Sequence, residues 1–131
     1  MSMRLLLDTH ALLWVLTEPA RMPDQLIERL SDPANELLVS AASAWECATK
    51  HRLGKLPGAD AVLASFADHL ANLGATEVPI STADALLAGS LNWAHRDPFD
   101  RVLAAQSIRR SVPLVSRDPV FSSLPGVGVL W

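Results

Sequence analysis

The stretch Arg4-Leu5-Leu6-Leu7-Asp8 (residues 4–8) decides the fold class of this chain. A short, almost wholly apolar run is typical of a strand that is buried on both faces of a parallel sheet. A second such run, at residues 113–116, is followed closely by another acid, Asp118. Ligands of open parallel sheets bind beyond the carboxyl ends of the strands, so Asp8 and Asp118 are candidates for a functional site.

Strand-like and helix-like segments alternate along the rest of the chain. Strands are expected at 4–7, 36–40, 76–80, 113–116 and 128–131, and helices at 9–16, 24–31, 43–53, 81–91 and 98–110, with a further helix carrying the apolar stripe between residues 63 and 73. This alternation predicts an α/β fold with a mostly parallel sheet of four to five strands, covered by helices on both faces. The length and the absence of a visible linker predict one domain over residues 1–131.

Composition narrows the class of protein. Half of the residues are hydrophobic, which predicts an ordered core, and no apolar stretch is long enough to span a membrane. The formal net charge of −3 argues against a protein that coats nucleic acid. A single cysteine, Cys47, cannot build a disulfide framework and is expected in the core. With no secretory signal visible at the start, a cytoplasmic protein is expected.

Four acids stand out, and each also has an ordinary structural explanation. Asp8 and Asp118 can cap the helical turns that follow them, because an Asp side chain accepts hydrogen bonds from free helix N–H groups. Asp100 lies in a first helical turn, where the helix dipole favours negative charge. Glu46 and Lys50 have the spacing of a surface ion pair on a helix.

A divalent-metal site is the functional alternative for these acids. All-oxygen ligands suit Mg²⁺ or Mn²⁺, and the absence of Cys/His spacing disfavours zinc. Asp97 and Asp100 are i, i+3 neighbours that can face one ion, although Asp97 is also a good helix cap before Pro98. The usual crossover predicts the first turn of helix 98–110 at the sheet edge opposite Asp8, so spacing alone does not assemble the site.

Four motifs together resemble the PIN domain, and more narrowly the VapC-type toxin of a bacterial type II toxin–antitoxin pair. They are Leu-Leu-Asp-Thr-His-Ala-Leu-Leu-Trp at 6–14, Ser-Ala-Trp-Glu at 43–46, His-Arg-Asp-Pro-Phe-Asp-Arg-Val-Leu-Ala-Ala-Gln at 95–106, and Leu-Val-Ser-Arg-Asp at 114–118. The resemblance spans nearly the whole chain. It implies a PIN-like three-layer α/β/α fold that brings all four acids into one pocket.

The resemblance implies a Mg²⁺- or Mn²⁺-dependent endoribonuclease that hydrolyses phosphodiester bonds of cellular RNA with a metal-activated water. The catalytic and metal-binding positions of the family match Asp8, Glu46, Asp100 and Asp118 one by one. Asp97 belongs to a variant motif, and it is either an auxiliary metal ligand or a helix cap.

Further residues near these motifs have expected supporting roles. Thr9 and Ser116 match hydroxyl positions that can hydrogen-bond a ligand carboxylate or a water. Arg101 and Arg117 are candidates for contacting RNA phosphate or a partner, with plain surface charge favoured for Arg101. Polar packing at loop ends is favoured over a general-base role for two histidines, His10 and His95.

The resemblance also implies partners. A cognate, VapB-like antitoxin is expected to wrap the toxin and to place an Arg or Lys in the acidic pocket. A homodimer is expected as well. Candidate interface residues are apolar, with the core favoured for Trp45: Leu12, Leu13, Trp14, Leu16, Trp45 and Trp93.

Two other functions remain as alternatives. A phosphoacceptor signalling domain would also gather acids at strand ends, but it needs a lysine after a late strand, and the chain has only Lys50 and Lys55. A catalytically inactive PIN-like binding module would keep the fold without needing the acids, all four of which are present.

Overall fold

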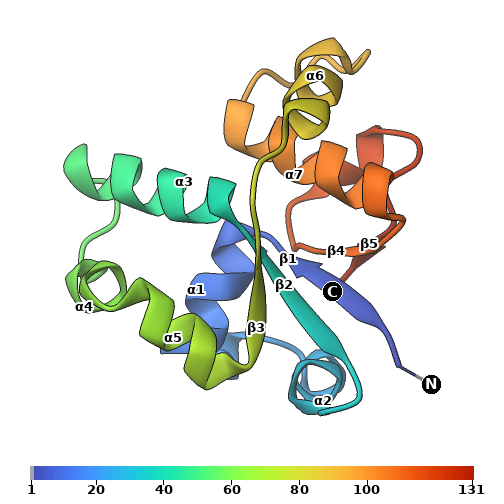
Figure 1. The fold of residues 1–131 in the computed structure, drawn as a ribbon. Helices are drawn as coiled ribbons and strands as arrows, with labels where there is room; N and C mark the ends of the chain where they lie inside the picture. The colour runs from blue at the N-terminus through green and yellow to red at the C-terminus, as the bar shows by residue number, and fades with distance from the viewer. Residues whose placement is uncertain (1) are drawn as a thin grey trace.

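A five-stranded parallel sheet runs through the middle of the computed structural model, which describes residues 2–131 (Figure 1). Its strands, in spatial order, are β3 (Ala75–Val78), β2 (Glu36–Ser40), β1 (Arg4–Leu7), β4 (Leu114–Val115) and β5 (Val129–Leu130). Each neighbouring pair is parallel. The predicted α/β class and the predicted parallel sheet are both confirmed.

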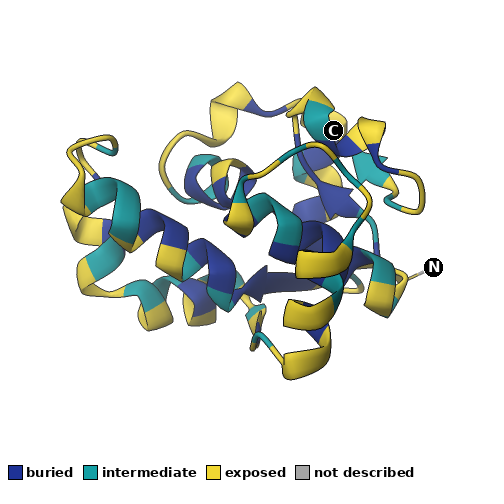
Figure 2. Cartoon of the chain, turned by 90° about the horizontal axis from the view of Figure 1, so that it is seen from above, coloured by how far each residue is buried: buried dark blue, intermediate teal, exposed yellow. Residues whose placement is uncertain are grey.

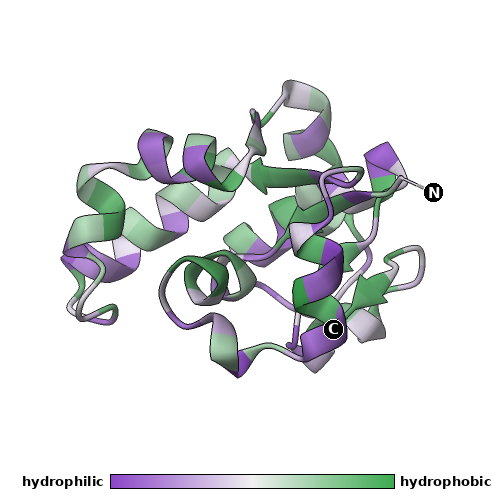
Figure 3. Ribbon diagram, turned by 90° about the horizontal axis from the view of Figure 1, so that it is seen from below, coloured by the Kyte–Doolittle hydropathy of each residue, from purple (hydrophilic) through white to green (hydrophobic). Residues whose placement is uncertain are grey.

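The central strands are buried on both faces, as their apolar runs predict. Successive side chains of a strand point to opposite faces, so Leu5 and Leu7 enter one core cluster and Leu6 enters another. β1 pairs with β2 on one side and with β4 on the other, with Leu7 opposite both Val39 and Val115. Figure 3 shows the strands largely in hydrophobic colours.

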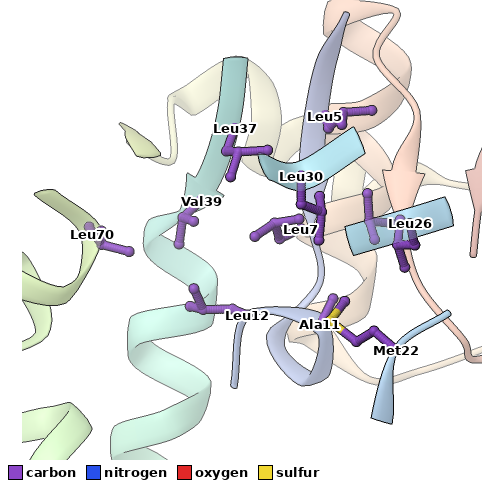
Figure 4. Packing of buried hydrophobic residues seen from close by; sticks show 11 residues of the cluster. Leu5, Leu7, Ala11, Leu12, Met22, Leu26, Leu30, Leu37, Val39 and Leu70 are labelled. Carbon is purple, nitrogen blue, oxygen red and sulfur yellow. The ribbon is translucent and has the colours of Figure 1, made fainter. Parts of the chain in front are cut away.

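Helices cover both faces of this sheet. One face carries α1 (Thr9–Thr17), α2 (Asp24–Ser31) and α5 (Phe66–Leu73), and the other carries α7 (Pro98–Arg110), against which α6 (Thr82–Ser90) packs. Figure 4 shows the first core, formed by Leu5, Leu7, Ala11, Leu12, Met22, Leu26, Leu30, Leu37, Val39, Leu70 and Val115. Helix α3 (Ala41–Arg52) follows β2, and α4 (Asp60–Ala64) precedes α5. The outer faces of the helices are exposed (Figure 2).

Several boundaries differ from the predicted ones for local reasons. The apolar stripe between residues 63 and 73 is divided between α4 and α5, because Ser65 takes a non-helical conformation with φ −136° and ψ 41°. β3 ends at Val78 instead of residue 80, since Pro79 has no N–H to donate to a neighbouring strand. α3 begins two residues early, where the Ser40 side chain accepts a hydrogen bond from the Ala42 N–H.

Three predictions about single residues have clear outcomes. Cys47 is fully buried, as expected, and burial raises the pKa of its thiol to about 11. Trp45 was expected in the core, but it is 52% exposed and rests edge-on against Phe99. Leu12 and Leu13 are buried in the core, so they are not available to a dimer interface.

No helix within residues 2–131 combines the length and the hydropathy that crossing a bilayer requires.

Candidate metal centre

One pocket of about 210 Å³ brings together the five acids that the sequence singled out. Its lining residues are Asp8, Thr9, His10, Glu46, Lys50, Asp97, Asp100, Asp118 and Phe121. The pocket lies at the carboxyl ends of β1 and β4, where ligands of parallel sheets bind. The structure therefore places these side chains as neighbours, and their binding of a metal stays a prediction.

Asp8 and Asp118 reach the pocket because β1 and β4 are adjacent strands. The Asp8 N–H donates to the Val115 carbonyl over 3.0 Å, which aligns the two strand ends. Asp8 Oδ1 accepts from the Ala11 N–H at 2.7 Å, and Asp118 Oδ1 accepts from the Val120 N–H at 3.0 Å. Both acids are therefore helix caps as well, and the predicted structural and functional roles coexist.

The expectation that Asp97 and Asp100 lie at the opposite edge of the sheet is wrong. α7 runs antiparallel to the strands, so it begins at their carboxyl ends and finishes at the amino end of β4, which starts at Leu114 (Figure 1). A helix that returns the chain to the start of the next parallel strand must run in this direction. Its first turn therefore belongs at the edge that holds Asp8.

The first turn of α7 carries the next two acids. Asp97 is a helix cap, because its Oδ1 accepts the Asp100 N–H at 3.0 Å, and Pro98 occupies the first helical position. Asp100 Oδ2 lies 2.7 Å from His95 Nε2. His95 is thus more than polar packing at a loop end, since it holds one of the acids in the pocket.

Glu46 is nearly enclosed, with only 4% of the residue exposed. Thr9 donates its hydroxyl to Glu46 Oε1 at 2.5 Å, and Lys50 Nζ lies 2.5 Å from Glu46 Oε2. The predicted bond from Thr9 to a candidate ligand carboxylate is therefore present. The predicted ion pair also forms, but it is buried at Glu46 and faces the pocket instead of the outer surface.

The pocket holds more negative charge than its cations offset. Burial raises the pKa of Asp8, although hydrogen bonds from Ser116 and the Ala11 N–H oppose the shift. Burial raises the pKa of Asp100 to about 6 against the opposing bond from His95, and the charges of Asp97 and Glu46 raise it further. A cation bound near these acids would stabilise their ionised forms.

The described residues do not enclose an ion with their present side-chain positions. Among residues 2–131, no three Asp, Glu, His or Cys side chains converge closely enough to hold a metal. Glu46 is held by Thr9 and Lys50, and Asp100 is held by His95. An ion at Glu46 Oε2 would compete with Lys50 for that oxygen.

Arg101 supports the site in a structural way that the sequence did not reveal. Its guanidinium donates to the carbonyls of Ala88 (2.8 Å), Leu91 (2.7 Å), Trp93 (2.9 Å) and His95 (2.8 Å). Arg101 is therefore not plain surface charge. It fixes the segment between α6 and α7, which carries His95 to Asp100. Backbone carbonyls leave no signal in a sequence, so this role of Arg101 could not be predicted.

Comparisons with known proteins agree with this architecture. The family model described as PIN domain matches residues 5–127. The structure is similar to that of VapBC2 from Rickettsia felis bound to a DNA fragment from their promoter, with a TM-score of 0.72 and 16% identity over 98% of this chain and 99% of that chain. It is also similar to VapBC-1 from nontypeable Haemophilus influenzae, with a TM-score of 0.68 and 17% identity over 98% of this chain and 97% of that chain. A toxin–antitoxin complex from Klebsiella pneumoniae has a TM-score of 0.64 and 15% identity over 96% of this chain and 95% of that chain. At these identities the likeness establishes a shared fold. No curated protein matches the chain significantly.

Proposed function

The chain belongs to the PIN domain family, whose members are nucleases, and we propose that it is a Mg²⁺- or Mn²⁺-dependent endoribonuclease acting as the toxin of a VapC-type toxin–antitoxin pair. The observation that carries the proposal is the single pocket lined by Asp8, Glu46, Asp97, Asp100 and Asp118. Burial raises the pKa values of Asp8 and Asp100, and such shifts within a pocket are typical of a functional site. The family match favours this function over the phosphoacceptor domain.

The donor set fits Mg²⁺ or Mn²⁺. The pocket offers carboxylate oxygens without Cys ligands, and such oxygens suit these hard cations. Asp8, Glu46, Asp100 and Asp118 would hold the ion, with Asp97 as an auxiliary ligand whose capping oxygen stays on α7. A bound ion would lower the pKa of a water and offset the charge that develops on the phosphoryl group.

The remaining residues of the pocket orient these acids. Thr9 fixes one oxygen of Glu46, His95 fixes one oxygen of Asp100, and the Ala11 N–H fixes one oxygen of Asp8. Asp8 and Asp100 thus each have one oxygen anchored, whereas both oxygens of Glu46 are held, by Thr9 and by Lys50. Lys50 balances part of the charge, and it can pair with an RNA phosphate once Glu46 turns towards a metal.

The proposed partners follow from the same charge. An antitoxin would inhibit the enzyme by placing an Arg or Lys in the acidic pocket, where a cation is favoured. The expected homodimer would have to use candidate residues that the core does not bury, among them Leu16 and Trp93. The proposed location is the cytoplasm, where cellular RNA and a reducing environment suit a chain with one cysteine.

The test is RNA cleavage by the purified protein, free of any antitoxin, in Mg²⁺ or Mn²⁺. Cleavage is expected with the ion and is expected to stop in chelator. Asp8→Asn should abolish cleavage, because it removes one charge from the proposed ligand set while the amide oxygen can still cap α1. Asp68→Asn is the matched control, since Asp68 is an exposed acid on α5.

Two results would overturn the proposal. Cleavage that continues in chelator would contradict the metal mechanism. A protein that cleaves no RNA and binds no divalent ion would instead be the inactive PIN-like binding module.

A further inference from the structure

A second pocket of about 290 Å³ adjoins the acidic one. It is lined by Asp8, His10, Trp14, Arg117, Asp118 and Pro119. Asp8, His10 and Asp118 line both pockets, so the two hollows lie side by side. A polymer with a phosphate at the acids can therefore extend into the second pocket.

Trp14 forms an aromatic wall of this second pocket. The Arg117 guanidinium carbon lies 5.6 Å from the centre of the indole, and the Arg21 guanidinium carbon lies 4.4 Å from it. Arg117 lines the second pocket, whereas Arg21 lines a separate hollow on which Trp14 also borders. The Trp131 ring packs edge-on against Trp14 at 5.6 Å and helps to fix its orientation.

This combination of groups matches one chemical class. Single-stranded RNA is recognised by stacking its bases on aromatic or Arg side chains and by pairing its phosphates with cations. Trp14 and Pro119 offer apolar surface for a base, and Arg117 offers a cation for a phosphate. A basic peptide is a poorer match, because Arg117 would repel it.

We propose that the pocket formed by His10, Trp14, Arg117 and Pro119 binds the nucleotide that flanks the scissile phosphodiester of single-stranded RNA. Its base packs against Trp14 and Pro119, and Arg117 pairs with a backbone phosphate. The proposal rests on the proposed nuclease function, and it names the part of the enzyme that grips the substrate beside the acids.

The experiment measures binding of a fluorescein-labelled single-stranded pentaribonucleotide by anisotropy, with Mg²⁺ present. Asp100→Asn serves as the background that stops cleavage, because Asp100 does not line the second pocket. Adding Trp14→Leu should weaken binding about 5- to 150-fold, the effect of losing one stacked base, without changing the salt dependence. Adding Arg117→Ala should make the salt dependence weaker. The slope of the log binding constant against log salt concentration should become less negative by about 0.7, the effect of losing one phosphate contact.

Matched controls separate the subsite from general effects on the fold or on charge. Trp45→Leu removes an exposed tryptophan outside this pocket, and Arg52→Ala removes an exposed arginine; neither should change binding in the same background. Circular dichroism checks that Trp14→Leu folds. A pentaribonucleotide carrying 4-thiouridine provides a readout with Trp14 intact, and it should crosslink to residues 10–14 or 117–119.

The outcomes separate this proposal from the proposed function. If the wild type cleaves RNA but the Trp14 and Arg117 variants bind it unchanged, or if crosslinks form only elsewhere, the subsite is overturned and the nuclease stands. Variants that keep RNA binding but lose binding of a hexa-arginine peptide would assign the pocket to a peptide, which also overturns the subsite. If the wild type cleaves no RNA and the Asp100→Asn protein binds none, both proposals fall.

Discussion

Asp84 and the carboxylates of the acidic pocket have opposite surroundings. Asp84, at the start of α6, is fully buried but accepts bonds from Gln106, Arg109, Arg110 and the Ser81 N–H. The acidic pocket holds five carboxylates against Lys50 and two histidines. The pKa of Asp84 is lowered despite burial, because four groups hydrogen-bond its charged form, whereas those of Asp8 and Asp100 are raised. Burial of a carboxylate therefore does not by itself indicate a functional site. A functional site is indicated where too few hydrogen bonds and cations compensate the negative charge.

The largest expected effect is on catalysis by the acidic pocket. Asp100→Asn should lower the rate of RNA cleavage by roughly 10²- to 10³-fold, because it removes a charged ligand from the proposed metal site. The free energy of unfolding at pH 7 should stay the same or rise, since the substitution removes a partly buried charge beside other acids. Cleavage rates and urea unfolding measure the two quantities. A large loss of stability with cleavage intact would show that Asp100 is structural.

At Asp84 we expect the opposite result, a loss of stability without a loss of cleavage. Asp84→Asn should lower the free energy of unfolding by about 2–4 kcal/mol, because Arg109 and Arg110 lose a buried charged acceptor. The cleavage rate of the folded protein should be unchanged, since Asp84 does not line the acidic pocket. Urea unfolding and cleavage at a temperature well below the transition check this. Unchanged stability would contradict the proposed difference between Asp84 and the carboxylates of the acidic pocket.

The two groups should also differ in their dependence on pH. The raised pKa of Asp100, about 6, means that the folded chain without metal retains a proton that the unfolded chain releases near pH 4. The stability contributed by that proton is present below pH 4 and is lost as the pH rises through about 6. Asp84, with its lowered pKa, stabilises the fold above pH 4 and loses this effect only as the pH falls through its folded value.

Urea unfolding at several pH values in chelator measures this difference. Relative to Asp100→Asn, the wild type should lose about 1–3 kcal/mol of stability between pH 4 and pH 7. Mn²⁺ should reverse the loss above pH 6, where Asp100 is ionised. A wild type and a variant with identical pH profiles would contradict the raised pKa of Asp100.

The smallest effect is expected at Arg101, a cation that bonds backbone carbonyls. Arg101→Lys should lower the cleavage rate by about 10-fold, because an ammonium cannot bond four carbonyls in the way that the planar guanidinium does. Hydrogen exchange of residues 88–95 should become faster, while exchange in β1 and β2 should stay slow. Unchanged exchange in residues 88–95 would show that the segment is held by other contacts.

Much of the fold was predictable from local signals. β1 and β2 were predicted with their observed bounds, because short apolar runs bounded by polar residues describe fully buried strands. The bounds of α7 were also correct, since Asp97-Pro98 is a strong start signal. The start of α6 also has a local signal, because Ser81 and Asp84 have the spacing of a capping box, and both of its hydrogen bonds are present.

What was missed depends on contacts between distant residues. The local pattern identifies Asp84 only as part of a helix cap, whereas its bonds with Gln106, Arg109 and Arg110 cross from α6 to α7. Trp45 was expected inside because tryptophan is largely apolar, yet its place on α3 leaves it exposed over Phe99. The motifs correctly indicated that the acids share one pocket. Spacing alone placed Asp97 and Asp100 at the wrong edge of the sheet, because the direction of α7 relative to the strands was assigned wrongly.

Titration of the purified protein with Mn²⁺ by calorimetry at neutral pH tests most directly whether the carboxylates of the acidic pocket share a divalent ion. Saturable binding is expected in the wild type and in Asp84→Asn, with a marked loss of affinity in Asp8→Asn and in Glu46→Gln. No saturable binding, or binding that Asp8→Asn and Glu46→Gln leave unchanged, would contradict the account.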